Sequence, residues 1–142
     1  MSVAPEVAYD VVSDVTRTGE WSPECVKVEW ITRGERFAGT NRDGSREWTM
    51  ECVIDEATRP TVFSFHTERP GKPGEARTQW GYRFAAVEGG TEITEWYQRV
   101  ADPPLITRLV ERFAMGGREK HNADNMRKSL ERLKRVVESS SA

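Results

Sequence analysis

The feature that most constrains the fold is a series of six short segments, between residues 25 and 100, in which apolar and polar residues alternate. Turn-forming residues such as Gly34, Asp43-Gly44 and Gly89-Gly90 separate several of them. Alternation bounded by such turns is typical of strands with one buried face, joined by hairpins. The sequence therefore predicts one antiparallel sheet with strands over residues 25–33, 36–42, 46–56, 61–68, 77–87 and 91–100.

Helical periodicity lies on both sides of this region. Pro5 followed by Glu6 is typical of a helix start, which predicts a short helix over 5–13 and a second helical turn over 14–19. After Pro104 we expect one helical segment to about residue 115 and a long helix over about 118–138. Gly116-Gly117 predicts a kink or break between them. A long amphipathic helix needs an apolar surface to cover, so the elements together predict an α+β fold.

The length and composition fit a single domain spanning residues 1–142. Hydrophobic residues make up 37% of the 142 residues, as in an ordinary globular domain. No apolar run approaches the roughly 18 residues of a membrane span, and the N-terminus lacks a signal-peptide pattern. We therefore expect a cytoplasmic protein with no integral membrane contact.

Charge is distributed unevenly along the chain. Residues 103–142 contain nine Lys or Arg and five Asp or Glu, whereas the whole chain has a net charge of −2. Two interpretations are a basic helix over an acidic body and a nucleic-acid surface. Phe113 is the one aromatic residue among these basic residues, which weakens the case for the stacking platform of a single-strand binder. We expect no nucleic-acid partner.

The face of the predicted sheet that turns inward is unusually aromatic. On three strands, alternate positions hold large apolar side chains, in the sets Trp48, Met50, Cys52 and Ile54; Phe63 and Phe65; and Trp80, Tyr82 and Phe84. The intervening positions suit solvent and hold Glu47, Thr49, Glu51, Gln79, Gly81 and Arg83. If Trp80 lines the core, Trp80→Ala should cost about 3–5 kcal/mol, and a cost below about 1 kcal/mol would indicate an exposed face or an open pocket.

Several local strings resemble a known family. APEVAYDVVSDV, EWSPE, RFAGTNRDGSREW, ECVIDEATRP and GGTEITEWYQ, in this order, are similar to the START-like superfamily with the helix-grip fold. The resemblance is to its bacterial polyketide cyclase/dehydrase-like group, also called SRPBCC, and it runs from Ala4 to about Val137. It implies a curved antiparallel sheet of about six strands wrapped around a long C-terminal helix, with two short helices near the N-terminus.

The resemblance also implies a deep apolar pocket between the sheet and the long helix. Such a pocket would hold a lipid, polyketide, isoprenoid or similar hydrophobic small molecule. The residues that we expect to contact this ligand are Trp21, Asn41, Trp48, Met50, Phe63, Phe65, Trp80, Tyr82, Tyr97, Phe113 and Met126. Family members normally begin with a strand before the first helix, and here only Met1 to Val3 precede Ala4. Either that strand lies upstream, or the last strand has an open edge that favours a homodimer over a monomer.

Trp21 lies in a segment, TRTGEWSPE, that otherwise has the composition of an exposed turn. Two interpretations remain open. In the first, Trp21 packs the helical corner onto the sheet. In the second, it is an aromatic residue at the pocket mouth that a ligand would touch.

Glu95 is the one candidate catalytic residue. If Ile93, Glu95 and Tyr97 face inward, burial would raise the pKa of Glu95 and make it a general acid or base for aldol cyclisation or dehydration. If Trp96 faces inward instead, Glu95 is a surface carboxylate. Arg99 would turn an inward Glu95 into a buried ion pair. Asn41, at a strand end, either orients a ligand carbonyl or only ends the strand.

No other catalytic or metal-binding pattern is present in the sequence. His66, opposite Phe63 and Phe65, is interpreted as a solvated histidine, and His121 lies away from the apolar stripe of its helix. Cys25 and Cys52 have no ligand or redox spacing and are interpreted as reduced side chains, with a disulfide between them as the alternative. We expect no metal and no cofactor. Three function classes remain: a binding or transfer protein, a polyketide cyclase or dehydratase, and a protein-interaction module that acts on a ribosome or chaperone.

Overall fold

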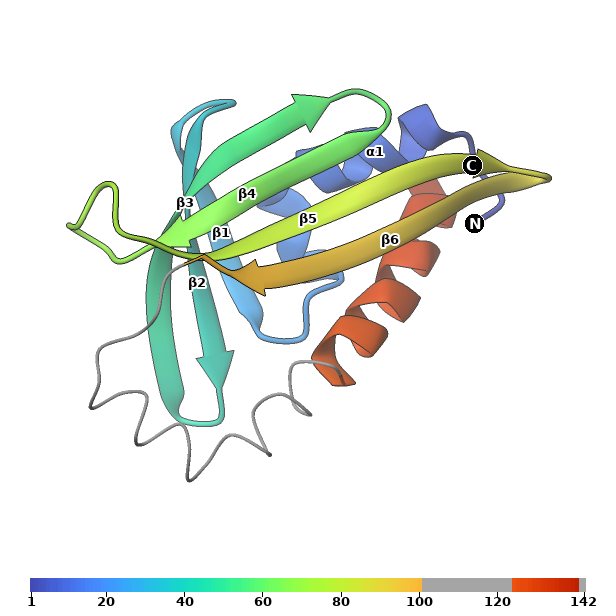
Figure 1. The fold of residues 1–142 in the computed structure, drawn as a ribbon. Coiled ribbons are helices and arrows are strands. Elements are labelled where there is room, and N and C mark those ends of the chain that lie inside the picture. Colours follow the sequence, from blue (N-terminus) through green and yellow to red (C-terminus); the bar gives the residue numbers. More distant parts are fainter. Residues whose placement is uncertain (101–123, 141–142) are drawn as a thin grey trace.

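In the part of the chain that the structure describes, six antiparallel strands form one curved sheet against three helical segments (Figure 1). The computed structural model describes residues 1–100 and 124–140. The strands follow one another in chain order, so each pairs with its sequence neighbour. The elements are α1 (Pro5–Ser13), the 3-10 helix η1 (Val15–Glu20), β1 (Cys25–Thr32), β2 (Arg36–Asp43), β3 (Arg46–Thr58), β4 (Val62–Glu68), β5 (Ala76–Val87), β6 (Gly90–Arg99) and a C-terminal helix over 124–140.

The predicted α+β architecture is confirmed, and the boundaries shift by one or two residues. The largest shift is in β3, which continues to Thr58 because Thr58 pairs with Val62 across the turn that contains Pro60. The Asp43-Gly44 hairpin is confirmed, with Gly44 at φ +62°, a backbone conformation that glycine adopts without steric cost. Predictions for Phe113, His121, the segment to residue 115 and the Gly116-Gly117 kink lie outside the described residues.

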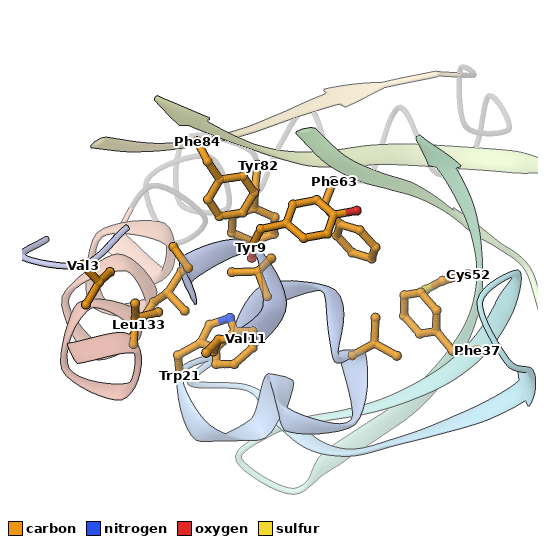
Figure 2. Packing of buried hydrophobic residues seen from close by; sticks show 14 residues of the cluster. Val3, Tyr9, Val11, Trp21, Phe37, Cys52, Phe63, Tyr82, Phe84 and Leu133 are labelled. Atoms are coloured by element: carbon orange, nitrogen blue, oxygen red, sulfur yellow. The ribbon is translucent and has the colours of Figure 1, made fainter. Parts of the chain in front are cut away.

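The core lies between the sheet and the helices (Figure 2). Tyr9 of α1 packs edge-on against Phe63 and Phe84, with ring centroids 6.3 and 5.6 Å apart. Leu133 and Val137 of the C-terminal helix are fully buried in the same cluster. Together these contacts fix α1 and the C-terminal helix on the inner face of the sheet.

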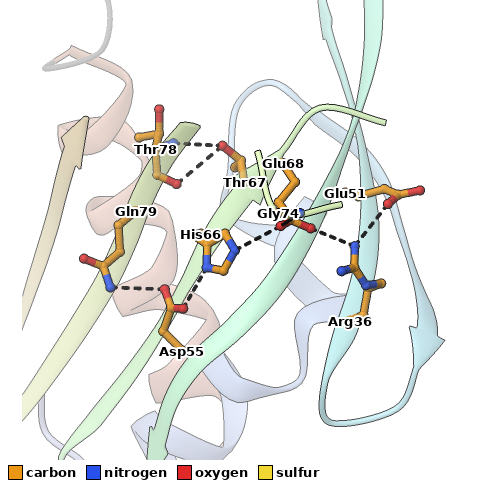
Figure 3. A network of polar contacts seen from close by, with 9 residues as sticks. All are labelled: Arg36, Glu51, Asp55, His66, Thr67, Glu68, Gly74, Thr78 and Gln79. Carbon is orange, nitrogen blue, oxygen red and sulfur yellow. Dashed lines mark hydrogen bonds and ion pairs between the residues drawn. The ribbon is translucent and has the colours of Figure 1, made fainter. Parts of the chain in front are cut away.

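The outer face of the sheet holds a network of charged side chains (Figure 3). Arg36 contacts Glu51 at 3.1 Å and Glu68 at 2.9 Å, although Glu68 is only 3% exposed. His66 lies on this face, as predicted, but it is not simply solvated. Its Nδ1 lies 2.7 Å from Asp55 and its Nε2 lies 3.5 Å from Glu68, because β3 and β4 place these side chains side by side.

Gly81 is a correction to the predicted faces. It lies on the outer face, as expected, but it is buried rather than solvent-exposed. The indole ring of Trp96 covers it from the neighbouring strand, and a Cβ on Gly81 would collide with that ring. The glycine therefore leaves room for Trp96 to pack flat on the outside of the sheet.

The N-terminal residues contact one end of β6. The Met1 amino group donates to the Thr91 carbonyl at 2.9 Å, and the Thr91 N–H donates to the Met1 carbonyl at 2.8 Å. The Thr91 hydroxyl also donates to the Val3 carbonyl at 2.6 Å. Residues 1–3 thus pair with the start of β6, and its remaining edge has no strand partner among the described residues.

Candidate functional site

A pocket of about 600 Å³ lies between the inner face of the sheet, η1 and the C-terminal helix. Every predicted ligand-contacting residue within the described part of the chain lines it. These are Trp21, Asn41, Trp48, Met50, Phe63, Phe65, Trp80, Tyr82, Tyr97 and Met126, together with Glu95. Phe113 lies outside the described residues, and ligand contact by any of these side chains stays a prediction.

Strand alternation explains how these side chains meet. Trp48 and Met50 lie two positions apart on β3, and Trp80 and Tyr82 do the same on β5, so each pair projects from one face. The rings of Trp80 and Tyr97 stack with centroids 5.0 Å apart. Trp80 is only half-buried because it faces the pocket. The open-pocket interpretation of this face is therefore closer to the structure than a closed core.

Glu95 projects into the pocket, and Trp96 faces outward. Tyr82 is the register partner of Glu95 on β5, and its hydroxyl donates to Glu95 Oε1 at 3.2 Å. Glu95 Oε2 is buried and has no hydrogen-bond partner within the described part of the chain. One carboxylate oxygen is therefore held by the protein, and the other is left with unused hydrogen-bonding capacity.

Burial raises the pKa of Glu95 to about 7, although the hydrogen bond from Tyr82 works against this shift. Arg99 is not among the causes of this shift, so the shift gives no support to the alternative of an Arg99–Glu95 ion pair. Burial also raises the pKa of Tyr82 well above its ordinary value, and the nearby Glu95 charge adds to this. Near neutral pH, Glu95 is therefore present in both its protonated and ionised forms, beside a neutral tyrosine.

Trp21 is 1% exposed, and it packs in the core while also lining the pocket. It follows η1, and its backbone N–H donates to the Thr18 carbonyl at 3.2 Å. The structure thus supports the packing interpretation, and contact with a ligand stays a prediction. The indole Nε1 is buried and has no hydrogen-bond partner among the described residues.

Three arginines that the sequence did not single out as ligand contacts also line the pocket. They are Arg69 just after β4, Arg77 on β5 and Arg99 on β6. Arg69 and Arg77 have no acidic partner among the described residues, unlike Arg36 and Arg42 on β2. Their sequence signal was weak, because isolated arginines near strand ends are ordinary surface residues.

Asn41 and the two cysteines also belong to the pocket lining. Asn41 is half-buried near the end of β2, opposite Trp48 on β3. Cys25 and Cys52 are unpaired, and burial raises the pKa of the Cys52 thiol to about 12, so it stays protonated at neutral pH. Within residues 1–100 and 124–140, no group of three His, Cys, Asp or Glu side chains is placed to hold a metal ion.

Comparison with known proteins gives a family and a fold. Residues 1–138 match the family described as polyketide cyclase / dehydrase and lipid transport. No curated protein matches the sequence. In the described part of the chain, no helix has the length and apolar character needed to cross a membrane.

Solved structures with low sequence identity share the fold. Protein TTHA0849 from Thermus thermophilus is 17% identical, with a TM-score of 0.69 over 100% of this chain and 94% of that one. Protein CV1439 from Chromobacterium violaceum is 16% identical, with a TM-score of 0.69 over 97% and 92%. The di-domain ARO/CYC BexL from the BE-7585A biosynthetic pathway is 20% identical, with a TM-score of 0.66 over 97% of this chain but 44% of its own.

Proposed function

Because this chain belongs to the polyketide cyclase / dehydrase and lipid transport family, we propose that it binds a hydrophobic small molecule in the pocket between sheet and C-terminal helix. The ligand is a lipid, polyketide or isoprenoid-like compound, and the protein acts as a binding or transfer protein. The observation that carries the proposal is the pocket itself. Its volume of about 600 Å³ lies within the usual range of small-molecule sites, and aromatic and apolar side chains dominate its wall.

The pocket also weighs against the protein-interaction class. A module that acts only through its surface needs no internal space, and side chains normally fill the interior of a domain to close packing. Here the side chains of Trp48, Met50 and Phe65 line a cavity instead of packing against other side chains on every side. Ligand binding accounts for this space, and docking to a ribosome or chaperone does not.

Native mass spectrometry of the purified protein tests the proposal directly. We expect an added mass that corresponds to a co-purified hydrophobic compound, or uptake of farnesol or dodecanoate when these are supplied. Titration of tryptophan fluorescence gives a second readout. Trp21→Phe should reduce the signal change on binding, whereas the control Trp30→Phe, outside this pocket, should retain it. A protein that takes up none of these compounds would contradict the proposal.

A second candidate function is a polyketide cyclase or dehydratase with Glu95 as general acid or base. The observation that favours it is the Glu95 pKa of about 7, which leaves both forms available near neutral pH. The ionised carboxylate can remove a proton from a carbon next to a ketone, and the protonated form can return one to a leaving hydroxyl. Glu95→Gln should abolish turnover of a poly-β-ketone substrate while retaining its binding. Unchanged turnover would exclude this role.

We further propose that the protein acts in the cytoplasm as a monomer or homodimer, without a nucleic-acid partner. The edge of β6 beyond Thr91 supports the dimer alternative, because a strand edge without a partner in the described part of the chain favours pairing with another chain. Equilibrium ultracentrifugation distinguishes the two states. A clean monomer at all concentrations would exclude a dimer built on this edge.

A further inference from the structure

The pocket wall is built in layers that three neighbouring strands share. Trp80 on β5 pairs with Tyr97 on β6 and with Phe65 on β4, which forms an aromatic layer. Two residues further along β5, Tyr82 pairs with Glu95. In the opposite direction, Thr78 pairs with Arg99. A charged layer, an aromatic layer and a carboxyl layer therefore follow one another along the sheet.

The other two pocket arginines belong to the charged layer. Arg77 precedes Thr78 on β5, and the Thr78 N–H donates to the Thr67 hydroxyl at 3.2 Å. Arg69 lies two residues after Thr67. All three arginines are thus on the same side of the aromatic layer. From Arg99 to Glu95 the chain advances four residues, a separation of roughly 13 Å in an extended strand.

The carboxyl layer contains unsatisfied hydrogen-bonding atoms. Glu95 Oε2 and Trp21 Nε1 are both buried without a hydrogen-bond partner among the described residues. Trp21 and Glu95 line the same pocket, together with Tyr82, whose hydroxyl donates to the other oxygen of the Glu95 carboxylate. Buried polar atoms without partners are costly, and a pocket-lining site with a free donor and a free acceptor suits an oxygen atom of a ligand.

The charged layer offers the opposite chemistry. Arg69 and Arg77 line the pocket and have no acidic partner in the described part of the chain. Guanidinium groups bind carboxylate and phosphate through paired N–H donors. A neutral acceptor would bind these guanidinium groups more weakly than an anion, and a cationic group would be repelled.

We propose that the ligand is amphipathic, with an anionic group held by Arg69 and Arg77 and a hydroxyl or ketone oxygen at its other end, held by Glu95 and Trp21. This inference rests on the proposed binding function and specifies its ligand class. A hydroxyl donates to ionised Glu95, and a ketone accepts from protonated Glu95. The aromatic layer between them holds the hydrocarbon part of the molecule. An anion at the inner end is disfavoured, because the ionised form of Glu95 would repel it.

Three matched probes test the inference on the wild-type protein by isothermal titration calorimetry. They are 12-hydroxydodecanoate, which has both groups, dodecanoate, which lacks the hydroxyl, and methyl 12-hydroxydodecanoate, which lacks the charge. We expect the hydroxy acid to bind most tightly and each of the others about threefold to tenfold more weakly, as the loss of one hydrogen-bonded group predicts. A phosphate ester of the same chain, dodecyl phosphate, shows whether a carboxylate or a phosphate suits the arginines better.

Two variants test which pocket residue binds each end of the ligand. Glu95→Leu should remove the preference for 12-hydroxydodecanoate over dodecanoate, whereas Arg77→Gln should remove the preference for the acid over its methyl ester. Arg83→Gln is the control, because Arg83 is exposed on the same strand but does not line the pocket. Equal affinity of the wild-type protein for the three probes would overturn this inference while the binding function stands. If none of them binds, both fail.

Discussion

Replacing Glu95 with Gln should stabilise the protein at alkaline pH and not at acidic pH. Gln retains an oxygen that accepts the Tyr82 hydrogen bond, but it cannot ionise. The pKa of Glu95 rises from 4.5 to about 7 on folding because the side chain is buried. Because the folded state binds this proton more tightly than the unfolded state, protonation of Glu95 adds to the free energy of unfolding. This contribution is fully present below pH 4.5 and is lost as the pH rises through 7.

The expected size follows from the shift. A difference between 4.5 and about 7, at about 1.36 kcal/mol per pH unit, corresponds to about 3 kcal/mol. This is an upper limit, because Glu95 keeps partial solvent contact that screens its charge. Relative to wild type, Glu95→Gln should therefore gain up to about 3 kcal/mol of unfolding free energy between about pH 4 and pH 8.

Urea unfolding followed by tryptophan fluorescence across this pH range measures the effect. Glu92→Gln is the matched control, since Glu92 is an exposed carboxylate on the same strand and its loss removes the same charge. Its free energy of unfolding should follow that of wild type at every pH. If the free energy of unfolding of Glu95→Gln differs from that of wild type by the same amount at every pH, Glu95 is not desolvated in the folded protein. That result would refute the placement of Glu95 in the pocket interior.

Three further predictions concern packing, and urea unfolding measures each. Phe63→Ala should cost about 3–5 kcal/mol, because Phe63 is 2% exposed in the core. Trp80→Ala should cost only about 1 kcal/mol, because the pocket borders one side of the Trp80 ring and the main loss is its stacking on Tyr97. A cost as large as that of Phe63→Ala would show a closed core. Gly81→Ala should cost about 1–3 kcal/mol because its Cβ collides with Trp96, and much less in a Trp96→Ala background; equal costs in both backgrounds would rule out this collision.

Most of the sheet could be predicted because its signals are local. Alternation and turn residues depend on neighbouring positions, so all six strands were predicted within one or two residues of their ends. Strand ends were less accurate because pairing across the sheet sets them. The extension of β3 to Thr58 depends on Val62 in the next strand.

The orientation of β6 was not decidable from its own residues. One face of β6 holds Ile93, Glu95 and Tyr97, and the other holds Trp96. Both faces carry large apolar side chains, so alternation alone could not predict which face points inward. The neighbouring strand decides between them. Gly81 is the register partner of Trp96 and leaves room for the indole on the outer face, which turns Glu95 toward Tyr82.

The sequence by itself thus determined the fold, the aromatic wall of the pocket and Glu95 as the residue to test, because these depend on period and residue type. Only the tertiary structure decided that Glu95 is buried, that Tyr82 holds one of its oxygens and that arginines from separate segments line the same pocket. Burial, and the pKa that follows from it, depends on which residues other strands bring alongside. That information lies in the register of the sheet, which no single segment contains.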